Sequence, residues 1–250
     1  MLTQKELKYF SSLKQKKYRQ KERKFIVEGK RLVNEALKSK YECEIVIMNR
    51  SFADKNNQPG LSKHLRSEIV SDKDYQKLTD TKSPQGITAV MLMLPAGLEI
   101  SGDEELIVAL ENISDPGNVG TIIRTCDWFG VRSVIISPGS VDLYNPKVIR
   151  STMGSLFHIN IFESDDFYDD LLKLKKKGMN ILCSDMDGKD IFTYRTKGSS
   201  VLIMSNEAHG PTEDALNIAD EIITIPKQGN AESLNVASAA SVMIAQLTKS

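Results

Sequence analysis

The C-terminal stretch EIITIPKQGNAESLNVASAASVMIAQL, residues 221–247, runs from a strand through a loop into a helix. The β-branched run 222–225 ends at Pro226, which suits a strand buried on both faces and prevents its continuation as a helix. Gly229 allows the unusual backbone angles of a loop. From Val236 onwards, apolar residues recur at helical spacing. This order of elements predicts an α/β fold.

Two polar residues, Ser233 and Asn235, lie where this loop becomes the helix. Both are good N-cap residues, because their side chains satisfy backbone N–H groups that lack a partner within the helix. The carboxyl end of a parallel strand is also where α/β proteins bind ligands. Spacing alone leaves both interpretations open.

The composition is that of a globular chain of 250 residues with a formal net charge of zero. Its apolar runs are too short to span a bilayer, and its N-terminus lacks the apolar stretch of a signal peptide. We therefore expect a cytoplasmic protein without membrane contact. Three cysteines and three histidines are widely scattered, so we expect no disulfide framework and no metal site.

The charge is unevenly distributed along the chain. Residues 1–31 contain 11 lysines and arginines against three glutamates. Such an excess attracts phosphate, which predicts a nucleic-acid contact. A solvated face of a lysine-rich helix is the alternative interpretation.

The order of predicted elements divides the chain into two domains. A small α/β unit over 1–95 is followed by a linker at 96–103, marked by proline, glycine and serine residues. Residues 104–250 alternate strand with helix, which predicts a mainly parallel sheet covered on both faces. Within the first unit we expect a loop over 49–60 and a helix over 61–66.

No nucleotide-binding or serine-hydrolase motif is present, since the sequence lacks G-x-G-x-x-G, G-x-x-x-x-G-K-[ST] and G-x-S-x-G. Instead, three polar clusters each follow a predicted strand. In a parallel sheet, all three would meet at the carboxyl edge, although any one of them alone is more often a turn. The clusters are Glu111, Asn112, Asp115 and Asn118; Asn206, Glu207 and His209; and Gly229, Ser233 and Asn235.

In order, these clusters resemble the three motifs of the SpoU (TrmH-like) RNA ribose methyltransferases of the SPOUT superfamily. The matching stretches are NISDPGNVGTIIRTCDWFG (112–130), LIMSNEAHGP (202–211) and IPKQGNAESLNVASAASVMI (225–244). Two residues depart from the pattern. Ser205 stands where the second motif usually has glycine, and Lys227 where the third usually has methionine.

The resemblance implies an α/β domain with a deep trefoil knot, S-adenosylmethionine as the methyl donor and an obligate homodimer. Arg124 would act as the base, or would hold the adjacent phosphate and stabilise the developing oxyanion. The other catalytic residues implied are Asn118, Glu207, Ser233 and Asn235. The implied cofactor-binding residues are Met204, Ser205, Asn206, Glu207, Ile225, Pro226, Gly229, Ser233 and Leu234.

The N-terminal stretches FIVEGKRLV (25–33) and SPQGITAV (83–90) resemble the RNA-binding domain that some members carry. NPKVIRSTMGSLF (145–157) resembles an intermediate segment of the family. We predict RNA contacts from Arg19, Arg23, Lys24, Lys30, Arg31 and Arg150. The implied activity is 2′-O-methylation of structured RNA, with ribosomal RNA as the leading substrate. Transfer RNA is one alternative, and a non-catalytic RNA-binding or ribosome-assembly role is the other.

Overall fold

A computed structural model describes residues 2–55, 64–95, 105–196, 198–206 and 208–249. The chain divides into two compact units. The N-terminal unit comprises residues 1–95 together with 142–157, and the C-terminal unit comprises residues 96–141 and 158–250. The sequence-based division placed 142–157 with the second domain, so the contacts of this segment differ from that expectation. Within the described ranges, every helix is too short or too polar to cross a membrane.

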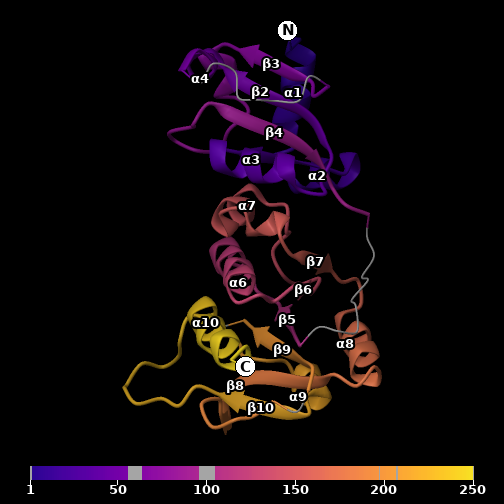
Figure 1. The fold of residues 1–250 in the computed structure, drawn as a ribbon, viewed down its shortest axis with the longest axis vertical. Helices are drawn as coiled ribbons and strands as arrows, with labels where there is room; N and C mark the ends of the chain where they lie inside the picture. The colour runs from indigo at the N-terminus through magenta and orange to yellow at the C-terminus, as the bar shows by residue number, and fades with distance from the viewer. Residues whose placement is uncertain (1, 56–63, 96–104, 197, 207, 250) are drawn as a thin grey trace. The chain divides into compact units, whose positions relative to one another are not determined.

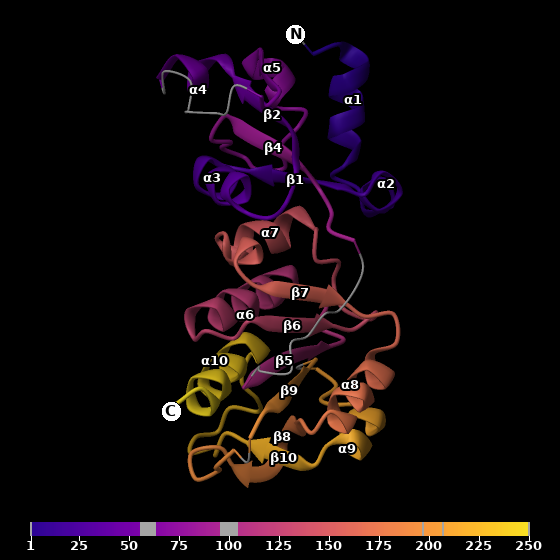
Figure 2. The same cartoon turned by 45° about the vertical axis from the view of Figure 1, so that its right-hand side comes forward.

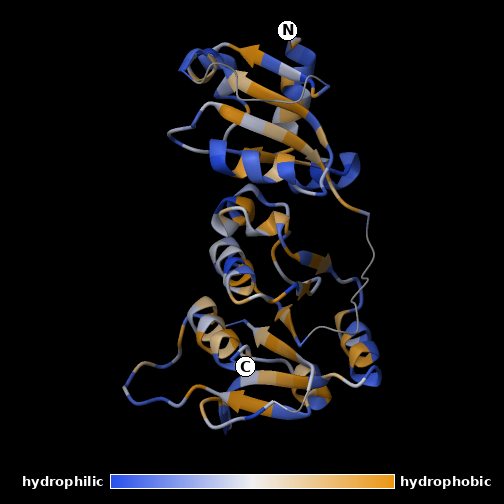
Figure 3. Cartoon of the chain, viewed as in Figure 1, coloured by the Kyte–Doolittle hydropathy of each residue, from blue (hydrophilic) through white to orange (hydrophobic). Residues whose placement is uncertain are grey.

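The N-terminal unit is built on a four-stranded sheet in the order β1-β4-β2-β3 (Figure 1). β4 pairs antiparallel with both of its neighbours, and β2 pairs parallel with β3. The strands are β1 (Lys24–Glu28), β2 (Cys43–Asn49), β3 (Ser67–Val70) and β4 (Ile87–Leu92), and the helices are α1 (Gln4–Ser12), α2 (Lys16–Glu22), α3 (Lys30–Lys38), α4 (Arg50–Lys55) and α5 (Asp72–Tyr75). Apolar colour follows the strands, whereas the helices show blue outer faces (Figure 3).

The segment 142–157 completes the core of this unit. It contains α7 (Pro146–Thr152) and a 3₁₀ turn (Ser155–Phe157). The ring of Tyr144 lies 4.6 Å from that of Phe25, and the ring of Phe157 lies 5.5 Å from that of Tyr41. Aromatic pairs at these distances stabilise a core beyond their buried area.

The prediction of a loop over 49–60 is wrong at its start, where α4 forms. The Asn49 side chain accepts a hydrogen bond from the Phe52 N–H at 2.8 Å, which starts the helix, and Phe52 and Ala53 are buried. Of the helix predicted over 61–66, residues 61–63 lie outside the described residues and 64–66 are not helical.

The C-terminal unit contains a six-stranded sheet in the order β10-β8-β9-β5-β6-β7, and every neighbouring pair is parallel. This confirms the predicted parallel sheet. Figure 2 shows α6 and α10 on one face and α8 and α9 on the other. The strands are β5 (Leu106–Glu111), β6 (Ser133–Ile136), β7 (Asn160–Glu163), β8 (Asn180–Asp190), β9 (Ser200–Ser205) and β10 (Glu221–Thr224), and the helices are α6 (Pro116–Trp128), α8 (Phe167–Lys176), α9 (Glu213–Ile218) and α10 (Val236–Leu247).

The central strands β5 and β9 are buried along their whole length. This follows from their continuous apolar sequences, which suit strands covered on both faces. The trefoil knot stays a prediction.

Candidate active site

The first two polar clusters meet at the carboxyl ends of β5 and β9. These strands are direct neighbours, and Glu111 pairs in register with Ser205. One residue further on, the Asn206 side-chain amide donates to the Asn112 carbonyl at 3.1 Å. Asn112 has a left-handed φ of 55°, and its N–H donates to the Ser137 hydroxyl at 2.8 Å. The chain therefore turns sharply at this edge and is held there by polar contacts.

The first and third clusters are joined by a side-chain hydrogen bond between two asparagines. The Asn235 amide donates to the Asn118 side-chain oxygen at 3.0 Å, across 117 residues of chain. The Asn235 oxygen also accepts from the N–H groups of Ala237 and Ser238, so Asn235 is the N-cap of α10. Asn235 thus has the capping role, and its second contact joins it to Asn118, while its role in a ligand site stays a prediction. Ser233 is exposed and does not cap the helix.

This link is supported by close packing of α6 against α10. The hydroxyls of Thr125 and Ser241 lie 3.2 Å apart, and Ala237 and Ala240 are buried. Small side chains allow two helices to approach closely. The face of α10 that carries small side chains therefore packs on α6 of the same chain. This packing fixes the position of Asn118 relative to Asn235.

Glu111 belongs to a structural network at the same edge. It is 1% exposed and accepts hydrogen bonds from the Tyr168 hydroxyl and, at 2.7 Å, from the Thr212 hydroxyl. Desolvation, together with the neighbouring carboxylate, raises the pKa of Tyr168 to about 12. Thr212 also caps α9. Glu111 therefore ties β5 to α8 and α9.

Arg124 is exposed on α6. It lies six residues beyond Asn118, which places it about 9 Å further along the helix axis at 1.5 Å per residue. Its side chain makes no hydrogen bond or ion pair with any described residue. Trp128, one turn further on, is 82% exposed. Since i and i+4 residues share a helix face, Arg124 and Trp128 lie on one open face of α6.

The predicted cofactor-binding residues lie on two segments. Met204 and Ser205 end β9 and are buried, and Asn206 follows directly. Ile225 and Pro226 follow β10 and are partly buried, whereas the three others on this loop, Gly229, Ser233 and Leu234, are exposed. Glu207 lies outside the described residues.

Ser205 offers one observation on the fit of a ligand at this edge. Its hydroxyl oxygen is buried and has no hydrogen-bond partner among the described residues. A buried polar atom without a partner is costly, so a ligand with a polar group at this point would remove the cost. S-adenosylmethionine carries such groups in its amino acid, ribose and adenine parts. The site therefore fits the donor that the sequence implies.

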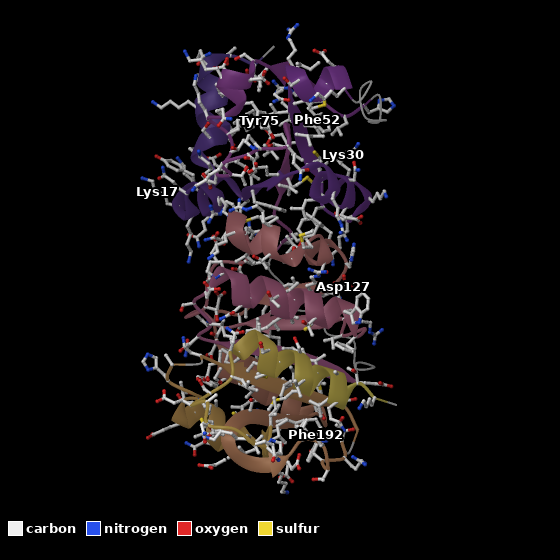
Figure 4. The ribbon with its side chains drawn as sticks, turned by 90° about the vertical axis from the view of Figure 1, so that its left-hand side faces the viewer. Lys17, Lys30, Phe52, Tyr75, Asp127 and Phe192 are labelled. Carbon is white, nitrogen blue, oxygen red and sulfur yellow. The ribbon has the colours of Figure 1, made fainter. Side chains whose placement is uncertain are left out.

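The six cations predicted to contact RNA differ in how far their side chains are exposed or already paired. Arg19 is 2% exposed, pairs with Asp142 and donates to two backbone carbonyls, so its burial excludes the predicted RNA contact. Lys24 pairs with Glu44 at 2.8 Å. The other four cations reach the surface in full or in part: Arg23, Lys30, Arg31 and Arg150. Figure 4 labels Lys30 on the N-terminal unit.

No cluster suited to a metal ion occurs among the described residues. The three cysteines are free thiols. Burial raises the pKa of Cys183 to about 12 and that of Cys43 to about 11, so both are protonated at neutral pH. A thiol must lose its proton to act as a nucleophile, and these two are poor candidates for one.

Comparisons with known proteins identify the family of the chain. Residues 105–245 match the model of the SpoU rRNA Methylase family, and residues 4–89 match that of the MRM3-like substrate binding domain. The chain is 32% identical over 245 residues to the 23S rRNA (guanosine(2553)-2′-O)-methyltransferase RlmP of Bacillus subtilis, covering 96% of this chain and 95% of that protein.

Solved structures are similar over nearly the whole chain, among them two at 28% identity. One is a putative RNA methyltransferase of the TrmH family from Porphyromonas gingivalis, with a TM-score of 0.90, 28% identity and coverage of 99% and 98% of the two chains. The other is an AdoMet-bound rRNA methyltransferase from Sinorhizobium meliloti, with a TM-score of 0.87, 28% identity and coverage of 99% and 95%. With the family model spanning 105–245 and the joined polar clusters inside that range, this chain belongs to the SpoU rRNA methylase family.

Proposed function

We propose that this protein transfers a methyl group from S-adenosylmethionine to a ribose 2′-hydroxyl of ribosomal RNA. The observation that carries the proposal is the hydrogen bond between Asn118 and Asn235, which joins two motifs of the family at one end of a parallel sheet. The full-length similarity to an rRNA 2′-O-methyltransferase of Bacillus subtilis supports the substrate class.

The segments after β9 and β10 hold the donor in this proposal. Backbone groups of residues 204–206 and of the loop 225–234 line its site, and the Ser205 hydroxyl gains the partner that it otherwise lacks. When bound, S-adenosylmethionine supplies an electrophilic methyl group on a sulfonium. Aligning the ribose oxygen with that methyl group is worth up to ~7 to 11 kcal/mol over free encounter.

Arg124 and the asparagines then act on the RNA. Arg124 is exposed, and its planar guanidinium suits a contact to both a ribose oxygen and the adjacent phosphate. A guanidinium stays protonated in proteins, so stabilising the oxyanion suits it better than accepting a proton. Asn118 and Asn235 position the start of α6 and α10 around the ribose. Glu207 and Ser233 complete the proposed catalytic set.

The N-terminal unit supplies RNA affinity in this proposal. Its exposed cations Arg23 and Lys30 suit phosphate contacts that carry no sequence information. Arg31 and, on α7, Arg150 add two further cations that can contact RNA. Each neutralised phosphate releases counterions, so binding weakens steeply with salt.

We further propose a homodimer that acts in the cytoplasm, where bacterial ribosomes are assembled. The open face of α6 carries Trp128, which is 82% exposed, and Phe129 beside it is 38% exposed. Aromatic residues are enriched in protein interfaces, and a second subunit would cover them. A mass of twice 27.9 kDa by light scattering is expected, and a monomer at every concentration would exclude this arrangement.

Methyl transfer to defined RNA pools tests the proposed activity. Ribosomal and transfer RNA from cells lacking the gene are incubated with the protein and methyl-labelled S-adenosylmethionine, and modified riboses are mapped. We expect one ribosomal position to be labelled. Label in transfer RNA alone would show that transfer RNA, and not ribosomal RNA, is the substrate. Cofactor binding and RNA binding without label in either pool would favour a non-catalytic assembly role.

A further inference from the structure

The N-terminal unit contains a cavity of ≈ 210 Å³, none of whose lining residues belongs to the predicted catalytic set. Three segments form it: the turn from β1 into α3, the loop before β4, and α7. Six of its lining residues matter here, namely Glu28, Arg31, Leu32, Gln85, Arg150 and Met153. All of them belong to the N-terminal unit.

The polar wall of the cavity is held in place by hydrogen bonds. The Thr81 hydroxyl donates to the Glu28 carboxylate, and the Gln85 side-chain oxygen accepts from the Lys30 N–H at 2.9 Å. Gly29, with a φ of 103°, lets Gln85 lie against the turn, since a Cβ at that position would be only 3.3 Å from the Gln85 oxygen. The cavity is therefore a built site with fixed acceptors.

The lining combines opposite charges with an apolar surface. Glu28 offers a carboxylate acceptor, while Arg31 and Arg150 offer planar donors. Leu32 is buried, and Met153 is 41% exposed with a thioether that makes favourable contacts to aromatic rings. A planar ligand with donors on one edge and acceptors on another complements this set.

Guanine has that pattern among the four RNA bases. Its N1–H and amino group can donate together to one carboxylate, and its O6 and N7 accept a bidentate arginine contact. Adenine has only its N6 amino group as a donor and cannot donate twice to one carboxylate. The pyrimidines have no N7 and cannot accept the bidentate arginine contact. Proteins read RNA in this way where bases are splayed out of the helix.

The size of the cavity limits its occupant. Pockets for drug-sized ligands measure ~300 to 1,000 Å³, so ≈ 210 Å³ suits a single base rather than a base pair or a larger metabolite. Lys82 lies between Thr81 and Ser83, which both line the cavity, and Lys30 precedes Arg31. Two cations are therefore sequence neighbours of the lining residues, and they suit contacts to the phosphates that flank a bound base.

We propose that this cavity binds an unpaired guanine of the RNA substrate, with Glu28 on its Watson–Crick edge and Arg31 or Arg150 on its O6 and N7. The inference rests on the proposed function for the source of the base, but the binding preference is independent of methyl transfer. It adds base-specific recognition to a unit whose other contacts are to phosphate.

The test uses the full-length protein and fluorescent pentanucleotides UUXUU in which X is each of the four bases. Fluorescence anisotropy at fixed salt should show at least tenfold tighter binding for X = G. Glu28→Gln should reduce this preference to less than threefold while leaving the affinity for UUUUU unchanged, because the paired acceptor is lost. Glu42→Gln removes an exposed carboxylate of the same unit and should keep the preference.

Arginine variants separate base contacts from general charge. Arg150→Ala should reduce the preference for G, whereas Arg66→Ala, which removes a cation paired with Glu6 outside the cavity, should weaken all four oligonucleotides equally or not at all. Thermal melting checks that each variant is folded, and the exposed Arg31 provides a further alanine variant if Glu28→Gln does not fold.

Two results would overturn the inference: equal binding of all four bases by the wild-type protein, or a preference for G that survives both Glu28→Gln and Arg150→Ala. The ribosomal RNA assay is run in parallel. If the protein transfers methyl groups but shows no base preference, only the guanine site is refuted. If it prefers guanine but transfers no methyl group, only the proposed activity is refuted.

Discussion

Ser205 places a hydroxyl where the second motif of the family usually has glycine. Its oxygen is buried without a partner among the described residues, which costs ~1 to 3 kcal/mol in the free protein. Ser205→Ala should therefore raise the melting temperature of the free protein. If the cofactor pairs with this hydroxyl, the same change should weaken S-adenosylmethionine binding about 2- to 12-fold, which corresponds to one hydrogen bond of ~0.5 to 1.5 kcal/mol.

Ser200 on the same strand is the matched control. It is 1% exposed, and its hydroxyl donates to the Gly198 carbonyl at 3.3 Å. Ser200→Ala should lower the melting temperature and leave cofactor affinity unchanged. For both variants, calorimetry measures the affinity for the cofactor and thermal melting measures the melting temperature. Tighter cofactor binding by Ser205→Ala would mean that the hydroxyl obstructs the site.

We expect Arg124 to affect the rate of methyl transfer and not the stability of the fold. Its side chain is exposed, so Arg124→Ala should change the free energy of unfolding by less than about 0.5 kcal/mol. Loss of a charge-stabilising group should reduce single-turnover methyl transfer at least ~100-fold, with cofactor affinity nearly unchanged. Arg124→Lys should also be poor, because lysine lacks the planar fork. Wild-type transfer by the alanine variant would exclude a catalytic role.

At this scale, the sequence predicted the asparagines better than the cations. Asn118 and Asn235 each follow a strand of a parallel sheet, so their approach follows from topology and periodicity. The burial of Arg19 could not be foreseen, because its partner Asp142 lies 123 residues away and belongs to another predicted domain. Glu111 was grouped with the first polar cluster for a similar reason. Its hydrogen-bond partners Tyr168 and Thr212 lie far along the chain, and no motif in the sequence links them to Glu111.

The pair of Arg19 and Asp142 anchors the segment that carries α7. The two side chains are 3% and 9% exposed, and Arg19 also donates to the Leu13 and Lys14 carbonyls. Removing one partner leaves a buried charge, so Asp142→Ala should lower the free energy of unfolding by ~3 to 5 kcal/mol. The double variant Arg19→Met, Asp142→Leu should be less destabilised than Asp142→Ala. Urea unfolding measures both, and a loss below 1 kcal/mol would contradict the anchoring role.

Tyr168 links α8 to the network around Glu111, and it makes stability depend on pH. Its pKa is raised from 10 in a free tyrosine to about 12, chiefly by desolvation, so the folded state favours the protonated hydroxyl. This contribution is fully present below pH 10 and is lost as the pH rises through about 12. The stability difference between wild type and Tyr168→Phe should therefore shrink between pH 9 and pH 11. Urea midpoints at both values test this, and a constant difference would disprove it.

Among elements, long periodic segments were predicted well and short ones were not. The helix after Asn235 and the strands of the parallel sheet follow from continuous apolar patterns. α4 spans only Arg50–Lys55 and has two buried residues, so its sequence looked like a polar loop. Its start depends on the Asn49 side chain, a local contact that weak helical periodicity does not reveal.

For the whole molecule, the contacts of 142–157 determine what truncation would do. Removing residues 1–95 uncovers Tyr144 and Phe157, which pack on Phe25 and Tyr41, along with the buried face of α7. Aromatic side chains bury ~150 to 250 Å² each, so the new apolar patch approaches or exceeds the largest patch of a typical monomer. The truncated protein should bind the dye ANS and aggregate, as measured by fluorescence and gel filtration. A monodisperse protein that does not bind the dye would refute this.

The predicted linker at 96–103 lies outside the described residues, and the sequence did not reveal that 142–157 belongs to the N-terminal unit. The apolar residues of 145–157 fit any hydrophobic surface, and periodicity does not say which one they cover. The pairing of Tyr144 with Phe25 joins residues more than 100 positions apart. Such pairings depend on the tertiary fold, and the resemblance of 145–157 to a family segment does not say which unit that segment packs against.

The position of 142–157 also bears on the order in which the nascent chain folds. The N-terminal unit lacks part of its core until Phe157 has been synthesised, 62 residues after Pro95. At ~5 to 20 residues per second, translation takes about 3 to 12 s to cover that distance. During this delay Phe25 and Tyr41 have no aromatic partner from α7 or its flanks. The core of the N-terminal unit is therefore completed only after β5, α6 and β6 of the C-terminal unit have been synthesised, and its head start in folding is shortened by that delay.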